Sequence, residues 1–401
     1  MRLISQAVLA GVLAATSTAA LAQKAYGPGV TDTEIKIGNT MPYSGPASAY
    51  SSQGRAETAY YKMINSKGGV NGRKINFISY DDAYSPPKTV EQTRKLVERD
   101  EIFANFGSLG TPTNSSIHKY MNQKNVPHLF VSTGAAKWND PKNFPWTLPL
   151  YPNYLMEGRI AAKYVAQAKP DGKIAILYQN DDSGKDYVKG FKEGLGAKAA
   201  SMIVIEKSYE VTEPTIDSQM VALKYSNADV FFAMSTPKFG AQAIKKAAEL
   251  NWKPLYFVVS VSSSIKSVLE PAGIENSKGL ITAIAAKIPS DPRWADAEDM
   301  KEFLAFMKEW MSGEDANDGS IGTGYMSAWM TVKVLKECGD NLTRENLLRV
   351  VTSQKKVAIP LLLPGITLTI TPDNYIGYNE LQMVRFDGKT WEPFGSVISA
   401  E

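Results

Sequence analysis

Polar and apolar residues alternate over residues 35–38, which is the pattern of a half-buried strand. The loop at 40–46 ends this strand because it contains two prolines and a glycine. Apolar residues then recur at helical spacing over 56–64, and Gly68 and Gly69 end that helix. Residues 74–80 alternate again. Two strands joined by a helix predict a right-handed parallel crossover, which is the unit of a doubly wound α/β sheet.

The strand–turn–helix pattern continues to residue 131, with further strands predicted at 102–106 and 126–131. Each of these strands ends in a turn of small hydroxyl or glycine residues. Residues 146–154 interrupt the pattern because they hold two prolines and three aromatic residues. We interpret this segment as the first crossing into a second lobe.

A second series of strands and helices follows. Its predicted strands are 173–178, 202–207, 229–234 and 255–259, and its predicted helices are 185–196, a segment around 216–223, and 238–250. Residues 279–287 read as a long apolar strand that could return to the first lobe, and helices follow near 295–312, 320–337 and 343–352. Residues 381–386 and 391–397 are predicted to pair as a closing hairpin through the tight turn Asp387-Gly388.

The chain's 401 residues are too many for one ordinary core and favour two lobes. Its 44 basic and 41 acidic residues leave a net charge of +3, so nucleic acid is not an expected partner. His118 and His128 lack metal-ligand spacing, and no nucleophile turn, phosphate loop or dinucleotide fingerprint is present. The adjacent Asp81 and Asp82 would point to opposite faces of a strand. We therefore expect no enzyme, no metal and no cofactor; a secreted hydrolase would need a nucleophile–base pair.

The first 22 residues have the features of a secretory signal: Arg2, an apolar run at 7–15, and Ala20-Leu21-Ala22 before Gln23. The alternative is a membrane anchor, but the apolar run is short and polar residues flank it. We predict cleavage after Ala22 and a mature protein in the periplasm. No cysteine follows the cleavage site, so a lipoprotein anchor is not expected, and the single cysteine, Cys338, has no partner within the chain.

Three sequence features of the first unit carry a family resemblance: the loop MPYSGP at 41–46, the helix end and turn at 65–75 with the pattern N-x-x-GG-x-NGR-x-I, and a strand ending in YDD at 80–82. Together they resemble the periplasmic solute-binding proteins of branched-chain amino-acid ABC importers. The order and spacing of elements extend the resemblance over essentially the whole mature chain.

The resemblance implies a type I periplasmic binding fold, in which two doubly wound parallel-sheet lobes are joined by three hinge crossings, the third near 365–371. We expect residues 23–149 with 285–366 to form the first lobe and residues 150–284 with 367–401 the second. It also implies a monomer that binds a small solute by closing its lobes and delivers it to a membrane permease driven by an ATPase. A ligand-sensing receptor domain for a signalling partner is an alternative role of the same fold.

Turns at the ends of strands are the predicted ligand-binding positions, because backbone N–H groups leading into a helix bind carboxylates when a hydroxyl assists. In the family the corresponding positions hold the ligand's carboxylate, and a tyrosine often lies over the cleft. The predicted first-lobe residues are Tyr43, Ser108, Leu109, Ser132, Gly134, Ala135 and Ala136. The alternatives are that Ser108 and Ser132 only cap helices and that Tyr43 is a half-exposed surface residue.

The second lobe departs from amino-acid binders of this family, which commonly place an acidic residue after the strand matching 255–259 to neutralise the ligand's ammonium. Here that turn reads Ser260-Val261-Ser262-Ser263-Ser264. Burying an ammonium without an anionic partner costs several kcal/mol, so we expect a carboxylate without an α-ammonium, favouring an aromatic or apolar acid. Asp182 could take the missing role, and a branched-chain amino acid is then the alternative ligand. The predicted second-lobe residues are Tyr151, Asp182, Ser183, Thr236 and Ser262.

Overall fold

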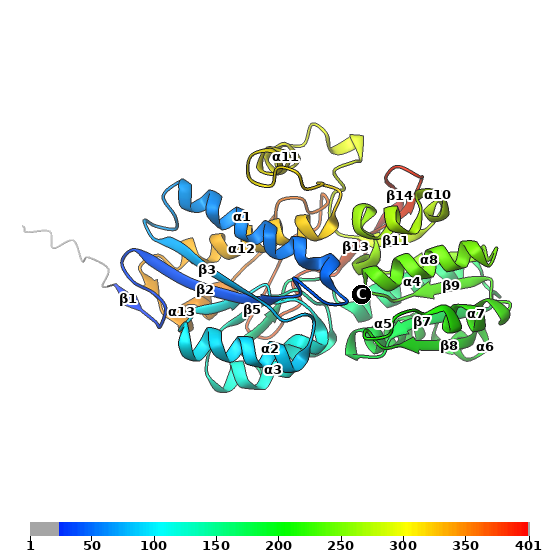
Figure 1. Cartoon of the computed structure of the whole chain (residues 1–401), viewed down its shortest axis with the longest axis horizontal. Helices are drawn as coiled ribbons and strands as arrows, with labels where there is room; N and C mark the ends of the chain where they lie inside the picture. Colours follow the sequence, from blue (N-terminus) through cyan, green and yellow to red (C-terminus); the bar gives the residue numbers. More distant parts are fainter. Residues whose placement is uncertain (1–23, 400–401) are drawn as a thin grey trace, which may run out of the picture.

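The computed structural model describes residues 24–399 and contains two large β-sheets with helices on both faces (Figure 1). The strands of the first sheet, in spatial order, are β3 (Lys74–Asp81), β2 (Glu34–Met41), β4 (Ala104–Phe106), β5 (His128–Val131) and β6 (Thr147–Pro149). Its strands are all parallel to their neighbours. The predicted signal segment lies outside the described residues.

The second sheet is mixed. Its strands, in spatial order, are β14 (Trp391–Ser399), β13 (Glu380–Phe386), β11 (Ile281–Ile284), β10 (Leu255–Val258), β9 (Val230–Ala233), β7 (Ile174–Gln179) and β8 (Ile203–Tyr209). The strands from β8 to β11 are parallel, whereas β13 and β14 run antiparallel as the predicted hairpin. The predicted two-lobed α/β fold is therefore confirmed.

Helices cover both faces of each sheet. In the first lobe, α1 and α12 lie on one face and α2 and α3 on the other (Figure 1). The helices of the first lobe are α1 (Ser51–Ser66), α2 (Pro86–Arg94), α3 (Thr111–Gln123), α11 (Glu298–Trp310), α12 (Gly319–Glu337) and α13 (Arg344–Val351). The helices of the second lobe are α4 (Tyr154–Ala168), α5 (Asp182–Leu195), α6 (Ala199–Met202), α7 (Asp217–Tyr225), α8 (Pro237–Glu249), α9 (Glu270–Ala272) and α10 (Ile274–Ser277). No helix within 24–399 has the length and hydropathy to cross a membrane.

Close helix contacts depend on glycine at two positions that matter for the site. A Cβ on Gly324 of α12 would lie 2.4 Å from the Gln53 carbonyl oxygen of α1. A Cβ on Gly190 of α5 would lie 2.1 Å from the Leu155 carbonyl oxygen of α4. Real side chains cannot approach backbone atoms so closely, so glycine lets each helix pair pack tightly and fixes the side chains that these helices direct toward the cleft.

Three differences from the predicted elements have clear causes. The strand expected at 279–287 to return to the first lobe is shorter, and as β11 it pairs with β10 and β13 in the second sheet. Its four residues are all buried, as expected for a central strand. Part of the predicted crossing at 146–154 forms the edge strand β6 of the first sheet. A small two-stranded sheet of β1 (Ala25–Tyr26) and β12 (Asn341–Leu342) was not predicted, because strands of two residues leave no periodic signal.

The chain passes between the lobes three times within the described range: between β6 and α4, after β11, and between α13 and β13. The parallel parts of the two sheets share one strand order, in which the first strand lies between the second and the third. In sheets of this kind ligands bind outside the carboxyl ends of the strands, where the strand order reverses. The two reversal points face one another across the gap between the lobes.

Candidate ligand-binding site

A cavity of about 170 Å³ lies between the two lobes, beside the ends of β4, β7 and β9. Both lobes and all three crossings contribute to its wall. The lining residues are Tyr50, Gln53, Tyr84, Leu109, Gly110, Thr111, Ser132, Tyr151, Pro152, Tyr154, Ser183, Met234, Thr236, Ser260, Val261, Ser263, Ser264, Ile284, Ala285, Ala286, Ile288, Gly319, Ser320, Thr323, Met326, Leu362 and Tyr378.

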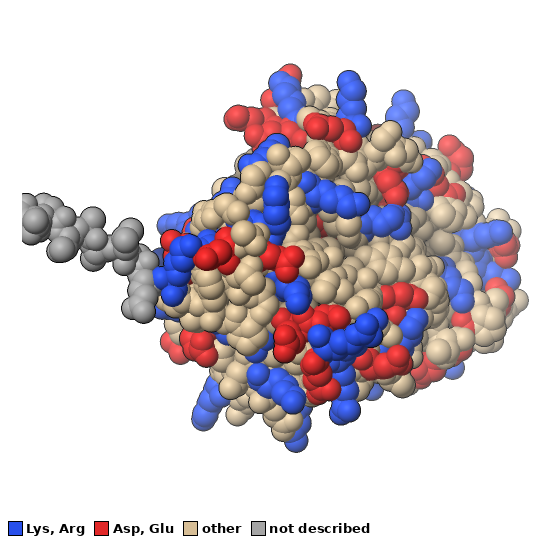
Figure 2. Space-filling model, turned by 60° about the vertical axis from the view of Figure 1, so that its left-hand side comes forward, with Lys and Arg blue, Asp and Glu red and all other residues tan. Residues whose placement is uncertain are grey.

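The cavity wall carries no charged side chain. Acidic and basic residues are spread widely over the outer surface (Figure 2), yet no aspartate, glutamate, lysine, arginine or histidine is among the lining residues. The wall instead combines aliphatic side chains, tyrosine rings, serine and threonine hydroxyls and one amide, Gln53. A ligand with a localised positive charge would therefore be buried without a counter-ion, at a cost of several kcal/mol.

Four helices begin at the cavity. Thr111 starts α3, Ser183 lies in the first turn of α5, Thr236 is the N-cap of α8, and Gly319 starts α12. The first N–H groups of a helix have no partner within the helix, and the helix dipole is positive at this end. At α5 and α12 these groups are already taken by acidic N-caps, because Asp181 accepts from the Gly184 N–H and Asp318 accepts from the Ser320 N–H. The N-caps of α3 and α8 make no side-chain capping hydrogen bond, so these two helix ends can attract an anion through backbone groups, without a cationic side chain.

The first-lobe wall is held by a buried network around Gln53. Its Nε2 donates to Glu57 Oε1 (3.1 Å) and to the Gly107 carbonyl oxygen (3.3 Å), so its Oε1 is the atom that accepts from Ser132 Oγ (2.9 Å). Asn39 Nδ2 donates to the other oxygen of Glu57 at 2.7 Å. Burial raises the pKa of Glu57 from 4.5 to about 8, although these hydrogen bonds act in the opposite direction.

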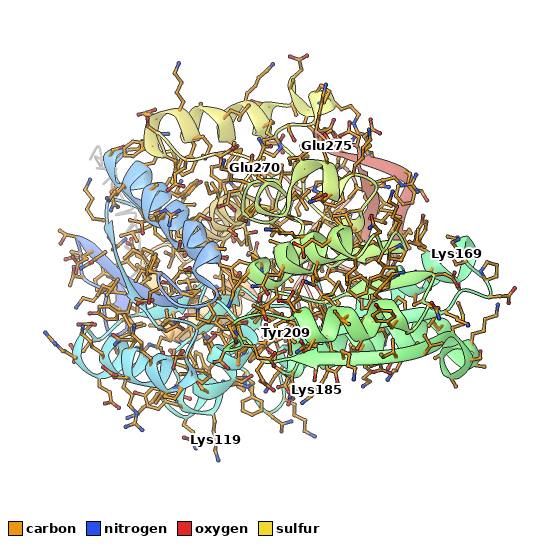
Figure 3. All side chains as sticks on the ribbon, turned by 45° about the vertical axis from the view of Figure 1, so that its right-hand side comes forward. Lys119, Lys169, Lys185, Tyr209, Glu270 and Glu275 are labelled. Atoms are coloured by element: carbon orange, nitrogen blue, oxygen red, sulfur yellow. The ribbon has the colours of Figure 1, made fainter. Side chains whose placement is uncertain are left out.

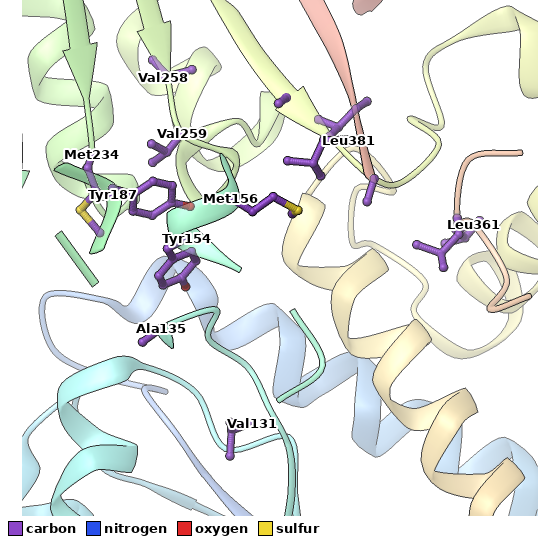
Figure 4. Packing of buried hydrophobic residues seen from close by; sticks show 14 of the residues in the cluster. Val131, Ala135, Tyr154, Met156, Tyr187, Met234, Val258, Val259, Leu361 and Leu381 are labelled. Carbon is purple, nitrogen blue, oxygen red and sulfur yellow. The ribbon is translucent and has the colours of Figure 1, made fainter. Parts of the chain in front are cut away.

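The second-lobe wall is held by Glu157, which is fully buried in α4. Its carboxylate accepts hydrogen bonds from the Ser260 backbone N–H (2.6 Å), from Ser260 Oγ (2.7 Å) and from the Tyr187 hydroxyl (2.8 Å). Burial raises the pKa of Glu157 from 4.5 to about 7, and the hydrogen bonds with Ser260 limit that rise. The Tyr187 ring stacks on the Tyr154 ring at 4.5 Å between centroids, and Figure 4 shows Tyr154 between Tyr187 and Ala135.

Hydrogen bonds join the two lobes beside the cavity. The Tyr50 hydroxyl donates to the Val261 carbonyl oxygen at 3.1 Å, and the Ala136 N–H donates to Asp186 Oδ2 at 2.7 Å. Tyr209 lies where the lobes meet (Figure 3), and its hydroxyl accepts a hydrogen bond from the Thr236 N–H at 3.0 Å.

Five of the predicted site residues line this cavity: Leu109, Ser132, Tyr151, Ser183 and Thr236. Ser132 directly follows β5, and Leu109, Ser183 and Thr236 lie within four residues of the ends of β4, β7 and β9, as the interpretation from strand ends requires. Whether they contact a ligand remains a prediction.

Several predicted residues are hydrogen-bonded to other protein groups and do not line the cavity. Ser108 is fully buried, and its hydroxyl donates to Asn105 Oδ1 at 2.8 Å. Ser262 is also fully buried and donates to the Ser235 carbonyl oxygen. The Tyr43 hydroxyl is hydrogen-bonded to Ser79 Oγ at 2.7 Å.

The remaining predicted positions either pack beside the first crossing or are exposed to solvent. Gly134 packs against that crossing, where a Cβ would lie 1.8 Å from the Pro152 carbonyl oxygen. Ala135 belongs to the buried core, and the Ala136 N–H is taken by Asp186. The Asp182 side chain is 54% exposed, pairs with Lys137 at 3.0 Å and is not among the residues that line the cavity, so nothing in this arrangement favours a contact between Asp182 and a ligand ammonium.

The sequence interpretation missed the cavity residues that come from helices and crossings. Gln53 and Tyr50 lie on or before α1, and Ser320 and Thr323 lie in the first turns of α12. An Asp318 N-cap followed by small polar residues was a usable signal for α12, because the Asp318 carboxylate accepts from the Ser320 N–H at 3.1 Å. Ile284, Leu362 and Tyr378 come from the second and third crossings, and nothing in their local sequence marks them.

Comparison with known proteins gives this geometry a context. A family model described as "Periplasmic binding protein" matches residues 34–389. The Leu/Ile/Val-binding protein of Escherichia coli K12 is 26% identical over 287 residues, which is 70% of this chain and 73% of that protein.

Solved structures share the fold. A branched-chain amino acid ABC transporter structure from Thermus thermophilus with bound valine matches with a TM-score of 0.82 at 16% identity, covering 92% of this chain and 97% of that one. A solute-binding protein from Rhodopseudomonas palustris BisB5 in complex with 3,4-dihydroxybenzoic acid matches with a TM-score of 0.75 at 20% identity, covering 92% and 98%.

Proposed function

The chain belongs to the periplasmic binding protein family, and on that premise we propose that it is the monomeric solute-binding component of an ABC importer. It captures a small aromatic or apolar carboxylate between its lobes and delivers it to the permease and ATPase subunits. Similar proteins are named for binding amino acids in some cases, and one was solved in complex with an aromatic acid, so only this chain's own cavity can indicate its ligand class.

The charge-free wall is the observation that carries the ligand class. The uncapped N-termini of α3 and α8 favour a carboxylate, and no lining side chain offers an anion to an ammonium. The size agrees, because an engineered apolar cavity of about 150 Å³ holds benzene and this one measures about 170 Å³. A single-ring aromatic acid or a short branched acid fits these limits.

A branched-chain amino acid is the second candidate, and Asp181 is the acid that would serve it. This part-buried residue is the N-cap of α5, next to the cavity residue Ser183. Its oxygens already accept from Gln179 Nε2 (2.6 Å), Ser183 Oγ (2.5 Å) and the Gly184 N–H (3.0 Å). An ammonium would have to displace these donors, which is why we place this candidate second.

Thermal unfolding with three ligands tests the proposal: benzoate, 4-methylpentanoate and leucine. The last two differ only by the amino group, so they isolate its effect. A ligand at a hundredfold excess over its Kd adds about 2.7 kcal/mol to the unfolding free energy and raises Tm. A shift with either acid and none with leucine supports the proposal. A shift with leucine supports the second candidate, and no shift with any ligand refutes the assigned ligand class.

The cellular location and the lobe limits given above also stay predictions. If residues 1–22 are a signal peptide, the protein recovered from the periplasmic fraction begins at Gln23, and N-terminal sequencing measures this directly. An uncleaved product retained with the inner membrane would refute that prediction.

A further inference from the structure

Several serine hydroxyls on the cavity wall already donate hydrogen bonds to acceptors within the protein. Each of the following oxygens donates to a protein acceptor and therefore offers the cavity only lone pairs. The bonds run from Ser132 Oγ to Gln53 Oε1 (2.9 Å), from Ser183 Oγ to Asp181 Oδ1 (2.5 Å), from Ser260 Oγ to Glu157 Oε2 (2.7 Å) and from Ser263 Oγ to the Ser260 carbonyl oxygen (2.8 Å).

Among these serines, Ser260 is the one whose hydroxyl is most firmly fixed as a hydrogen-bond donor to the protein. One oxygen of the Glu157 carboxylate accepts from its backbone N–H and the other from its hydroxyl, and an ionised carboxylate has no proton to return. Glu157 cannot turn away, because it is fully buried and the Tyr187 hydroxyl also binds it. A serine oxygen keeps two acceptor positions after its proton is used, so one remains for the cavity even with the Tyr151 hydroxyl nearby.

We propose that Glu157 is a positioning residue that acts through Ser260 to select ligands carrying a hydrogen-bond donor in addition to the carboxylate. This inference rests on the proposed function of the cavity and adds the chemistry of the ligand's other polar group. The helix N-termini receive the carboxylate, and Ser260 Oγ receives the donor. Two kinds of donor share this chemistry, a hydroxyl group and an ammonium, and the ligands chosen below distinguish them.

The alternative role of Glu157 is purely structural, since it ties α4 to the turn after β10. A structural role predicts that replacing Glu157 lowers the affinity for every ligand by a similar factor. A positioning role predicts a change in the ratio between a ligand with the donor and one without it. In Glu157→Gln, the amide oxygen can take the Ser260 N–H, and the amide NH₂ then donates to Ser260 Oγ. The hydroxyl proton of Ser260 would then point into the cavity, where it would repel a hydrogen-bond donor of the ligand.

The experiment measures dissociation constants by calorimetry at about pH 8, where Glu157 is mostly ionised given its pKa of about 7. Two matched comparisons are used: benzoate against 3- and 4-hydroxybenzoate, and 4-methylpentanoate against leucine. The variants are Glu157→Gln, Ser260→Ala and the control Ser262→Ala, which makes the same change in the same turn at a buried serine off the cavity wall. Tm without ligand reports the stability of each variant.

We expect the wild type to favour the donor-bearing member of one pair by on the order of tenfold, which is the value of one hydrogen bond. Glu157→Gln and Ser260→Ala should bring this ratio close to one, and Ser262→Ala should preserve it. A preference among the benzoates identifies a hydroxyl as the donor. A preference for leucine identifies an ammonium and replaces the proposed ligand class by the second candidate.

Two results would overturn the inference while leaving the proposed function intact. One is tighter wild-type binding of the acids without a donor. The other is an unchanged ratio in both Ser260→Ala and Glu157→Gln. If none of the ligands binds the wild type, the proposed ligand class itself fails, and this inference fails with it.

Discussion

Placing a negative charge at Thr236 tests whether the cavity is built for an anion. Thr236 is 3% exposed, lines the cavity and is the N-cap of α8, where its side chain makes no capping hydrogen bond. Asparagine and aspartate are both favoured at N-cap positions and have the same shape. Thr236→Asp and Thr236→Asn should therefore fold alike and differ by one charge inside the cavity.

The size of the effect follows from the cavity's dimensions. A sphere of 170 Å³ is about 7 Å across, so we take about 7 Å as the separation between an aspartate on the wall and a ligand carboxylate. At an effective dielectric constant of about 20, two like charges at this distance repel by about 2.4 kcal/mol, which is a factor of about 60 in Kd. We expect Thr236→Asp to bind benzoate about 60-fold more weakly than Thr236→Asn.

Calorimetry at about pH 8 measures this difference, because a buried aspartate can have a raised pKa and must be kept ionised. Repeating the titration at high salt checks that the repulsion is internal, since salt screens exposed charges far more than buried ones. Equal affinities for the two variants would refute the reasoning, because the carboxylate would then bind elsewhere. Tighter binding of leucine by Thr236→Asp than by Thr236→Asn would show that an ammonium occupies the cavity.

Further predictions concern the groups around the cavity. Because the pKa of Glu57 is raised from 4.5 to about 8, its ionisation opposes folding, and the unfolding free energy falls as pH rises through this window; Glu57→Gln should reduce that fall in urea titrations. Gly134→Ala would place a Cβ 1.8 Å from the Pro152 carbonyl oxygen, so the first crossing must shift; we expect a stability loss above about 2 kcal/mol and loss of ligand binding. Asp186→Ala removes the acceptor of the Ala136 N–H across the cleft, and calorimetry should show about fivefold weaker ligand binding because the closed form loses about 1 kcal/mol.

Each of these changes has a control or a contradicting result. Gly322→Ala is the control for Gly134, because its Cβ would meet only Leu361 Cδ1 at 4.0 Å, and it should leave binding unchanged. Asp182→Ala removes an exposed ion pair with Lys137 and should change affinity very little. An unchanged pH profile in Glu57→Gln, or equal effects of Asp182→Ala and Asp186→Ala, would contradict the corresponding reasoning.

Periodicity predicted the longer helices well because each buries one face, whereas the short strands are buried throughout and were marked by apolar runs between turns. The helix predicted at 238–250 is observed as α8 at Pro237–Glu249, and the hairpin predicted around Asp387-Gly388 is observed as β13 and β14. The strand predicted at 279–287 is observed as the shorter β11 (Ile281–Ile284), which lies wholly in the second sheet. An apolar run shows that a strand is buried, but it does not show which of two sheets it joins, because that depends on pairing with distant residues.

The candidate site was predictable only where it follows strand ends. Ser183 and Thr236 line the cavity because their strands place them there, whereas Gln53 does so because α1 packs against α12 through Gly324. Asp182 shows the limit of sequence reasoning most clearly. Asp181 is the N-cap of α5 and Ser183 lines the cavity, yet Asp182 between them points to solvent. A helix turns through 100° per residue, so an error of one residue in its start exchanges inward and outward side chains.

In the proposed site, backbone groups bind the ligand's carboxylate and side chains bind the rest of the ligand. This explains why the fold is a poor guide to the ligand. Every residue except proline has a backbone N–H, so a carboxylate held by helix N-termini requires a strand order and helix starts but few particular side chains. Such a site tolerates extensive sequence change, and proteins at 26% identity or less retain the arrangement of elements that produces it. The ligand's other end is recognised by side chains, and one pair such as Glu157 and Ser260 can decide whether a donor is accepted there. On the proposed function, the fold therefore predicts the carboxylate and individual residues predict the rest of the molecule.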